Sequence, residues 1–128
     1  MAAKRNHTEK IINKEYKFPS FSTISGSGPN SSIIHYKATP ETNRVLRKDE
    51  LYLVDSGGQY HFGTTDVTRT LSFGNIPSYI KDIYTRVLKG HIAVSNFKIK
   101  EKSTGSKIDM MARKYLKKIN LDYPHGTG

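Results

Sequence analysis

The 128-residue chain contains no cysteine. It can therefore form no disulfide, no thiolate nucleophile and no cysteine metal site, and a bound metal would need oxygen and imidazole ligands. Long apolar runs are also missing, because no segment approaches the ~18 consecutive apolar residues of a membrane helix. The basic opening, residues 1–5, leads into polar residues instead of a signal segment. These absences predict a soluble, cytoplasmic protein with no membrane partner.

Apolar and acidic residues are both scarce. Hydrophobic residues make up 35% of the chain and the mean hydropathy is -0.60, which predicts a thin core. The 21 basic and 11 acidic residues give a net charge of +10, which would attract a phosphate backbone. The lysines, however, are scattered from Lys4 to Lys118 and are not concentrated around aromatic residues. Nucleic-acid binding is therefore the less favoured hypothesis, and it would require tight binding that weakens steeply with salt.

Hydrophobic patterning predicts an α+β fold. Residues 1–17 are expected to form a frayed or helical N-terminal segment, and the turn formers of residues 25–32 predict a loop. Strands are expected at residues 33–36, 51–55 and 66–73, the second of them buried on both faces. Apolar residues then recur at three- and four-residue intervals, which predicts helices over residues 78–94 and 108–119. Strands followed by helices favour helices packed on a mainly antiparallel sheet.

Two carboxylates stand out against this pattern. Asp55 ends a hydrophobic strand, where an ionised carboxylate is costly to bury without a partner, and Asp66 opens the next expected strand. A strand-turn-strand connection of this length could bring both to one cluster, and paired carboxylates suit a two-metal site. Alternatively, Asp55 caps a turn and Asp66 pairs with Arg69. Spacing alone favours this second interpretation.

A longer pattern surrounds these carboxylates. Residues 55–60 and 63–70, DSGGQY and GTTDVTRT, strongly resemble the metal-binding core of Xaa-Pro aminopeptidases in the creatinase and aminopeptidase P family. Further segments resemble that family in the same order, at residues 25–30, 33–36, 40–44, 87–93 and 121–128. The resemblance implies that residues 18–128 are the first part of a pita-bread metallopeptidase domain. It also implies hydrolysis of peptides that carry proline in the second position.

The resemblance further implies particular residue roles. Family members bind two divalent ions, commonly manganese, through two aspartates, one histidine and two glutamates. Asp55 matches the aspartate that holds one ion, and Asp66 matches the one that bridges both. His35 matches a histidine of the substrate site, and His125 matches a catalytic histidine that assists substrate binding and proton movement. Without the resemblance, a sheet-bonded strand histidine and a solvent-exposed loop histidine would be the favoured interpretations of these two.

The resemblance also has departures. In the family, the motif begun at residues 125–128 continues into the metal-binding histidine, and both glutamates follow later. Three of the five ligands are thus expected to be absent from these 128 residues, which predicts no hydrolysis by this chain alone and unburied apolar faces. Lysines replace the family's phenylalanine-proline turn in residues 96–105. An alternative is a noncatalytic binding module that pairs with a second-half chain, and a homodimer is a further possible partnership.

Overall fold

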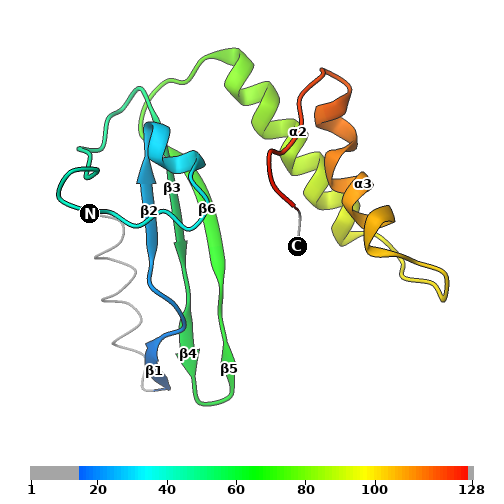
Figure 1. Ribbon diagram of the computed structural model, residues 1–128, viewed down its shortest axis with the longest axis horizontal. Coiled ribbons are helices and arrows are strands. Elements are labelled where there is room, and N and C mark those ends of the chain that lie inside the picture. The colour runs from blue at the N-terminus through cyan, green and yellow to red at the C-terminus, as the bar shows by residue number, and fades with distance from the viewer. Residues whose placement is uncertain (1–14, 127–128) are drawn as a thin grey trace. The chain divides into compact units, whose positions relative to one another are not determined.

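The computed structural model describes residues 15–126, which fall into two compact units that divide between Ile76 and Pro77. Figure 1 shows a unit of strands and a unit of helices. Together they confirm the α+β class expected from the sequence. Most of the N-terminal segment expected at residues 1–17 lies outside the described residues.

The first unit contains two three-stranded antiparallel sheets. Their orders are β1-β4-β5 and β2-β3-β6, and every strand pair is antiparallel, as the sequence predicted. Figure 1 shows β1 in line with β2, β4 in line with β3 and β5 in line with β6. The strand bounds are β1 Tyr16–Pro19, β2 Ile24–Ser27, β3 Leu51–Ser56, β4 Gly58–Tyr60, β5 Gly63–Thr64 and β6 Val67–Ser72.

The three interruptions lie at one level of the sheet. They fall at residues 20–23, at Gly57 and at residues 65–66. Hydrogen bonds join them, because the Ser20 amide donates to the Gly57 carbonyl (3.3 Å) and the Thr65 amide donates to the Gly58 carbonyl (2.8 Å). Neighbouring strands therefore stay hydrogen-bonded across the line where their ladders are interrupted.

Strand β3 supplies most of the core of this unit. Its burial alternates, with Tyr52, Val54 and Ser56 buried and the residues between them only half-buried. The expectation of burial on both faces was therefore wrong, because one face of this antiparallel sheet stays partly open. The Tyr52 hydroxyl lies 2.8 Å from Ser25 Oγ, so the polar end of this buried ring is satisfied by the neighbouring strand.

The strand expected at residues 33–36 is wrong. A 3₁₀ helix, η1 (Gly28–Ser32), is followed by a turn in which His35 has a φ of 55°. Tyr36 then enters the core, and its hydroxyl accepts from Asn30 Nδ2 and donates to the Thr42 carbonyl, both at 2.9 Å. Pairing of these groups within the turn outweighs the β propensity of two isoleucines and a tyrosine.

The loop expected at residues 25–32 is also partly wrong. Ser25, Gly26 and Ser27 belong to β2 and pair with Val54, Leu53 and Tyr52 of β3. Serine and glycine have low strand propensity, but an adjacent, strongly hydrophobic strand provides backbone partners for them. The strand at residues 25–27 therefore depends on pairing with residues distant in sequence, and its own residues do not predict it.

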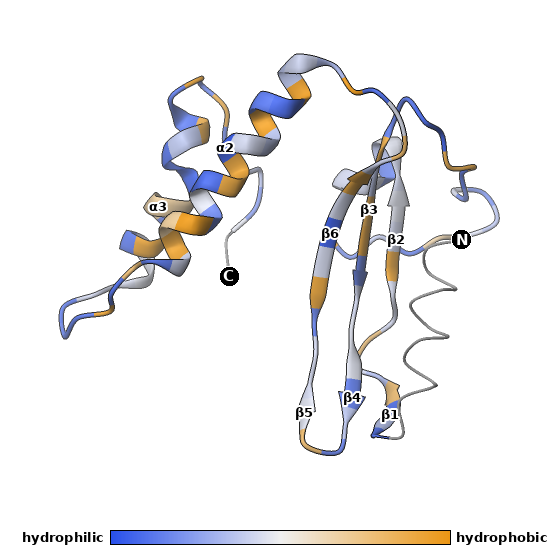
Figure 2. Ribbon diagram, turned by 180° about the vertical axis from the view of Figure 1, so that it is seen from behind, coloured by the Kyte–Doolittle hydropathy of each residue, from blue (hydrophilic) through white to orange (hydrophobic). Residues whose placement is uncertain are grey.

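The second unit is a pair of helices. They are α2 (Ser78–Ser95) and α3 (Gly105–Lys117), and both predicted helices are confirmed. Figure 2 shows apolar and polar positions alternating along each helix, as amphipathic helices require. Leu116 and Gly90 are buried where the helices meet, while Leu88 and Ile92 remain exposed. None of the described helices is long and apolar enough to cross a membrane.

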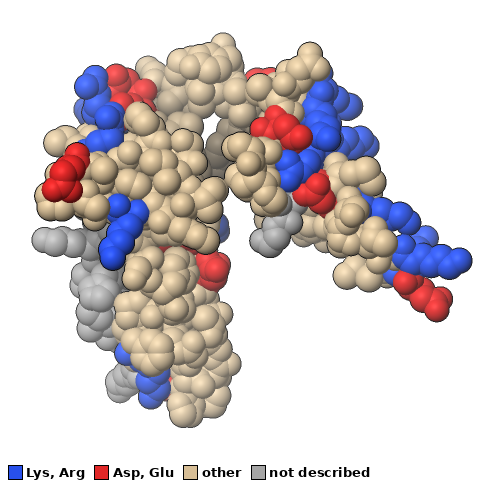
Figure 3. Space-filling model, viewed as in Figure 1, with Lys and Arg blue, Asp and Glu red and all other residues tan. Residues whose placement is uncertain are grey.

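Charged side chains of the helical unit are largely mixed in sign. Figure 3 shows lysine and arginine over this unit together with acidic side chains. Arg86 pairs with Asp82 at 2.7 Å and Arg113 pairs with Asp109 at 2.9 Å, each along its own helix. Over the described residues, only four hydrophobic side chains are buried, which confirms the thin core: Tyr36, Tyr52, Val54 and Leu116.

Gly90 allows α2 and α3 to approach closely. A Cβ at this position would overlap the Ala112 carbonyl oxygen of α3. Gly90→Ala should therefore destabilise the helix pair by about 1–3 kcal/mol, even though alanine is normally the better helix former. Gly105→Ala is the matched control, because an added Cβ there meets nothing within 4 Å. Denaturant unfolding followed by circular dichroism distinguishes the two variants, and equal stability of both would contradict the close approach.

Candidate metal and substrate site

A cavity of about 460 Å³ opens in the strand unit beside the shared line of interruptions. Its walls come from the segment between β1 and β2, from the turn after η1, from β3 and from the residue before β6. The structure thus brings together three of the four residues singled out from the sequence. The lining residues are Phe21, Ser22, Thr23, Ile24, His35, Tyr36, Lys37, Asp55 and Asp66.

Asp55 occupies the central strand of its sheet, where it pairs with Ile24 on one side and Thr68 on the other. Its Oδ1 atom is buried and has no hydrogen-bond partner within the described part of the chain. A buried carboxylate oxygen without a partner costs free energy that a cation would recover. The turn-capping role considered for Asp55 is not found here.

Asp66 lies one residue before β6, not at its start as predicted. Asp55 pairs with Thr68, which lies two residues after Asp66, and both aspartates line the same cavity. They are therefore candidates for binding a common ligand. The alternative pairing with Arg69 is absent among the described residues, and the Arg69 guanidinium instead donates to the Thr68 carbonyl at 2.7 Å.

The backbone between the two aspartates is held by contacts that the sequence did not reveal. Ser20 Oγ donates to the Thr65 carbonyl at 2.9 Å, and the Gly58 amide donates to Thr65 Oγ1 at 2.9 Å. Gly57 fits against this carbonyl, where an added Cβ would overlap both the Thr65 oxygen and Ser20 Oγ. The only sequence signal for these contacts is the glycine pair at positions 57 and 58.

His35 reaches the cavity from the turn after η1. Its side chain is exposed, and its φ of 55° is a left-handed conformation that non-glycine residues adopt at a cost. The sheet-bonded strand histidine considered from the sequence is therefore wrong. The same turn brings Lys37 to the lining of this cavity.

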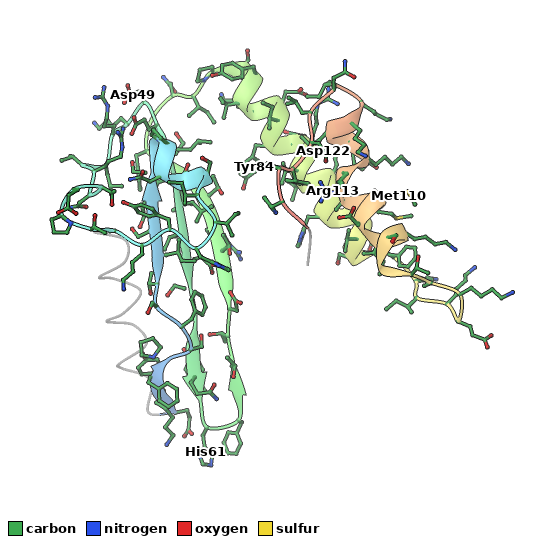
Figure 4. All side chains as sticks on the ribbon, in the orientation of Figure 1. Asp49, His61, Tyr84, Met110, Arg113 and Asp122 are labelled. Carbon is green, nitrogen blue, oxygen red and sulfur yellow. The ribbon has the colours of Figure 1, made fainter. Side chains whose placement is uncertain are left out.

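His125 belongs to the helical unit, so the structure gives it no geometric relation to the cavity. Its side chain is exposed, and its ring centroid lies 5.6 Å from that of Tyr123. Of the histidines without an assigned role, His91 lines a separate cavity of about 560 Å³ within the helical unit. Figure 4 places His61 at the tip of the hairpin between β4 and β5.

The donor set fits a hard divalent cation in part. Asp55 and Asp66 offer carboxylate oxygens, one of them buried and unpartnered, and such ions prefer oxygen ligands. Across residues 15–126, however, no three histidine, aspartate or glutamate side chains come together as a metal cluster. The cavity by itself therefore offers a cation two anionic ligands.

The family model for metallopeptidase family M24 matches residues 2–128 of the chain. Among curated proteins, Xaa-Pro aminopeptidase ApepP of Drosophila melanogaster is 52% identical over 113 residues, which cover 88% of this chain and 18% of that protein. Xaa-Pro aminopeptidase 2 of Homo sapiens is 48% identical over 110 residues, covering 86% of this chain and 16% of its own length. The chain thus spans less than one fifth of these relatives.

Solved structures show the same similarity in three dimensions. X-prolyl aminopeptidase from Caenorhabditis elegans, described as a cytosolic enzyme with a di-nuclear active site, superposes with a TM-score of 0.86 at 38% identity. That match covers 98% of this chain and 20% of the other. Prolidase from Pyrococcus furiosus gives a TM-score of 0.74 at 28% identity, covering 93% and 34%. These neighbours confirm the pita-bread class that the resemblance implied.

Gly57 provides a test of how the cavity is held. Gly57→Ala should lower the free energy of unfolding by about 1–3 kcal/mol, because the new methyl group must displace the Thr65 carbonyl or Ser20. Gly63→Ala in β5 is the control, since its added Cβ has no neighbour within 4 Å. Thermal unfolding compares the two, and a Gly57 variant as stable as the wild type would show that the close approach is not required.

Proposed function

The chain belongs to metallopeptidase family M24, and from that premise we propose that residues 18–128 form part of the catalytic domain of an Xaa-Pro aminopeptidase. The reaction would be hydrolysis of the bond between an N-terminal residue and a following proline. Peptides with proline in the second position would be the substrates. A cytoplasmic location is proposed with it, in line with the cytosolic enzyme of C. elegans.

The observation that carries this proposal is the unpartnered carboxylate in the cavity. Buried Asp55 Oδ1 has no hydrogen-bond partner among the described residues, while Asp66 and His35 line the same space. We assign Asp55 to hold one divalent ion and Asp66 to bridge two, with manganese as the proposed metal. When bound, the two metal ions would polarise a carbonyl group and lower the pKa of water.

The histidines are assigned to the substrate. His35, exposed on the rim of the cavity, would contact the bound peptide. His125 would orient the peptide and move a proton near the scissile bond, because an imidazole can donate or accept a proton near neutral pH. The adjacent Lys37 adds a positive charge that could bind a carboxylate or carbonyl oxygen of the peptide.

A polypeptide of these 128 residues should bind metal without catalysing hydrolysis. The family's metal site uses five ligands, and we assign Asp55 and Asp66 to two of these positions. We assign none of the 128 residues to the histidine position or to the two glutamate positions. Two carboxylates attract a divalent ion weakly and leave most of its coordination to water. Activation of a single water molecule for attack is therefore not expected of this polypeptide.

Manganese binding followed by calorimetry tests the assignment of the aspartates. The chain should bind Mn²⁺ weakly, and Asp55→Asn or Asp66→Asn should each reduce the affinity about tenfold or more, because each removes one of two anionic ligands. Asp49→Asn is the matched control, since Asp49 is an exposed aspartate that pairs with Arg47 at 3.1 Å. Equal affinities in all four proteins would exclude a metal site at Asp55 and Asp66.

A hybrid enzyme tests the activity itself. In the Drosophila relative, the matched 113-residue segment would be replaced by the corresponding segment of this chain. The hybrid should hydrolyse an Xaa-Pro dipeptide, and Asp55→Asn or Asp66→Asn within it should abolish turnover, whereas Asp49→Asn should not. A hybrid that folds and binds Mn²⁺ but stays inactive would contradict the proposed activity for this sequence.

A further inference from the structure

The segment that carries His125 has no regular secondary structure. After α3, Asn120 adopts a φ of 57°, and the amides of Asn120 and Leu121 donate to the Lys117 and Leu116 carbonyls at 3.2 Å each. This pattern is a Schellman motif, which ends the helix and sends the chain out in a defined direction. Beyond Leu121, described residues 122–126 form no backbone-to-backbone hydrogen bond. Their conformation must therefore be held by side chains.

One side chain of α3, Arg113, reaches most of this segment. Its Nη1 donates to Asp122 Oδ1 at 2.9 Å and to the Tyr123 carbonyl at 3.0 Å, and its Nη2 donates to the His125 carbonyl at 2.7 Å. The guanidinium also lies 5.6 Å from the centroid of the Tyr123 ring. Figure 4 shows Arg113 between α3 and the C-terminal segment, beside Asp122.

Arg113 is itself held in place before it reaches the segment. Its Nε donates to both oxygens of Asp109, one turn earlier in α3, at 3.0 and 2.9 Å, and its side chain is only 12% exposed. Asp122 is held from two sides, since its Oδ1 also accepts from the Tyr123 amide at 2.9 Å. These bonds, with the one from Arg113 the strongest cause, lower the pKa of the Asp122 carboxyl.

A second arginine shows what a simple helix-stabilising pair looks like. Arg86 of α2 also bonds an aspartate one turn earlier, Asp82 at 2.7 Å, and it donates to one carbonyl outside its helix, that of Tyr115 at 3.2 Å. Arg113 makes three hydrogen bonds outside its helix, two to the carbonyls of Tyr123 and His125 and one to the Asp122 carboxylate. The pair between Arg113 and Asp109 stabilises α3 in the same way as the pair between Arg86 and Asp82 stabilises α2. The bonds from Arg113 to residues 122–125 therefore need a separate explanation.

We propose that Arg113 is a positioning residue that orders the segment carrying His125 by hydrogen bonding the carbonyls of Tyr123 and His125. The consequence for hydrolysis depends on the role proposed above for His125, but the ordering itself does not. Lysine cannot replace arginine here, because a single ammonium on a flexible stem cannot span carbonyls two residues apart together with two carboxylates. The planar guanidinium offers donors that point in fixed, divergent directions.

Nuclear magnetic resonance on the intact 128-residue chain tests this proposal in Arg113→Lys, which keeps the charge and the aliphatic stem. The ring-to-ring nuclear Overhauser effect between Tyr123 and His125, whose centroids lie 5.6 Å apart, should be lost. Backbone order parameters of residues 122–126 should fall from values near 0.85 to below about 0.6, while those of α3 stay unchanged. Arg86→Lys is the matched control, and it should leave both readouts for the His125 segment as in the wild type.

Two results would overturn the proposal. One is a segment that stays equally ordered in Arg113→Lys, since the carbonyl bonds would then be dispensable. The other is a parallel loss of order in α3 and in the segment, which would make Arg113 a general stabiliser of the helix. Neither readout depends on metal or turnover, so failure of manganese binding at Asp55 and Asp66 would reject the proposed function without affecting this test.

Discussion

The free-energy cost of burying an unpaired carboxylate oxygen is the constraint around which the strand unit is arranged. Asp55 lies in the middle strand of its sheet, and its Oδ1 has no partner among the described residues. The turn that carries His35 and the connection that carries Asp66 both open onto the cavity beside it. A bound cation would recover this cost, and this is the physical basis of the metal site proposed above.

The shared interruption of the strands lies beside this cavity. Gly57 separates β3 from β4 and lies directly against the Thr65 carbonyl. Ser20 bonds both partners of this contact, through its amide to Gly57 and its hydroxyl to Thr65. Backbone geometry and carboxylate position are therefore linked, because the residue after Thr65 is Asp66 itself.

In the helical unit, the segment after α3 is held by side chains. A segment without backbone hydrogen bonds can be ordered only by side chains, and Arg113 combines a support within its own helix with three bonds outside it. The guanidinium donates hydrogen bonds to carboxylates and to carbonyls, so its positive charge strengthens these bonds and its planar shape fixes their directions. Arg86 also bonds an aspartate of its own helix, but it makes only one hydrogen bond outside that helix.

The sequence by itself determined both helices, strands β3 and β6, the antiparallel α+β class and, through several motifs in family order, the family. These features follow from local periodicity or from contiguous residues, which a single chain displays directly. Only the tertiary structure decided that Ser25–Ser27 form a strand, that residues 33–36 form a turn, and that Gly57, Ser20 and Arg113 hold the candidate residues. Those outcomes depend on partners distant in sequence, such as Val54 for Ser25 and Thr65 for Ser20, and on one long side chain whose reach no sequence pattern records.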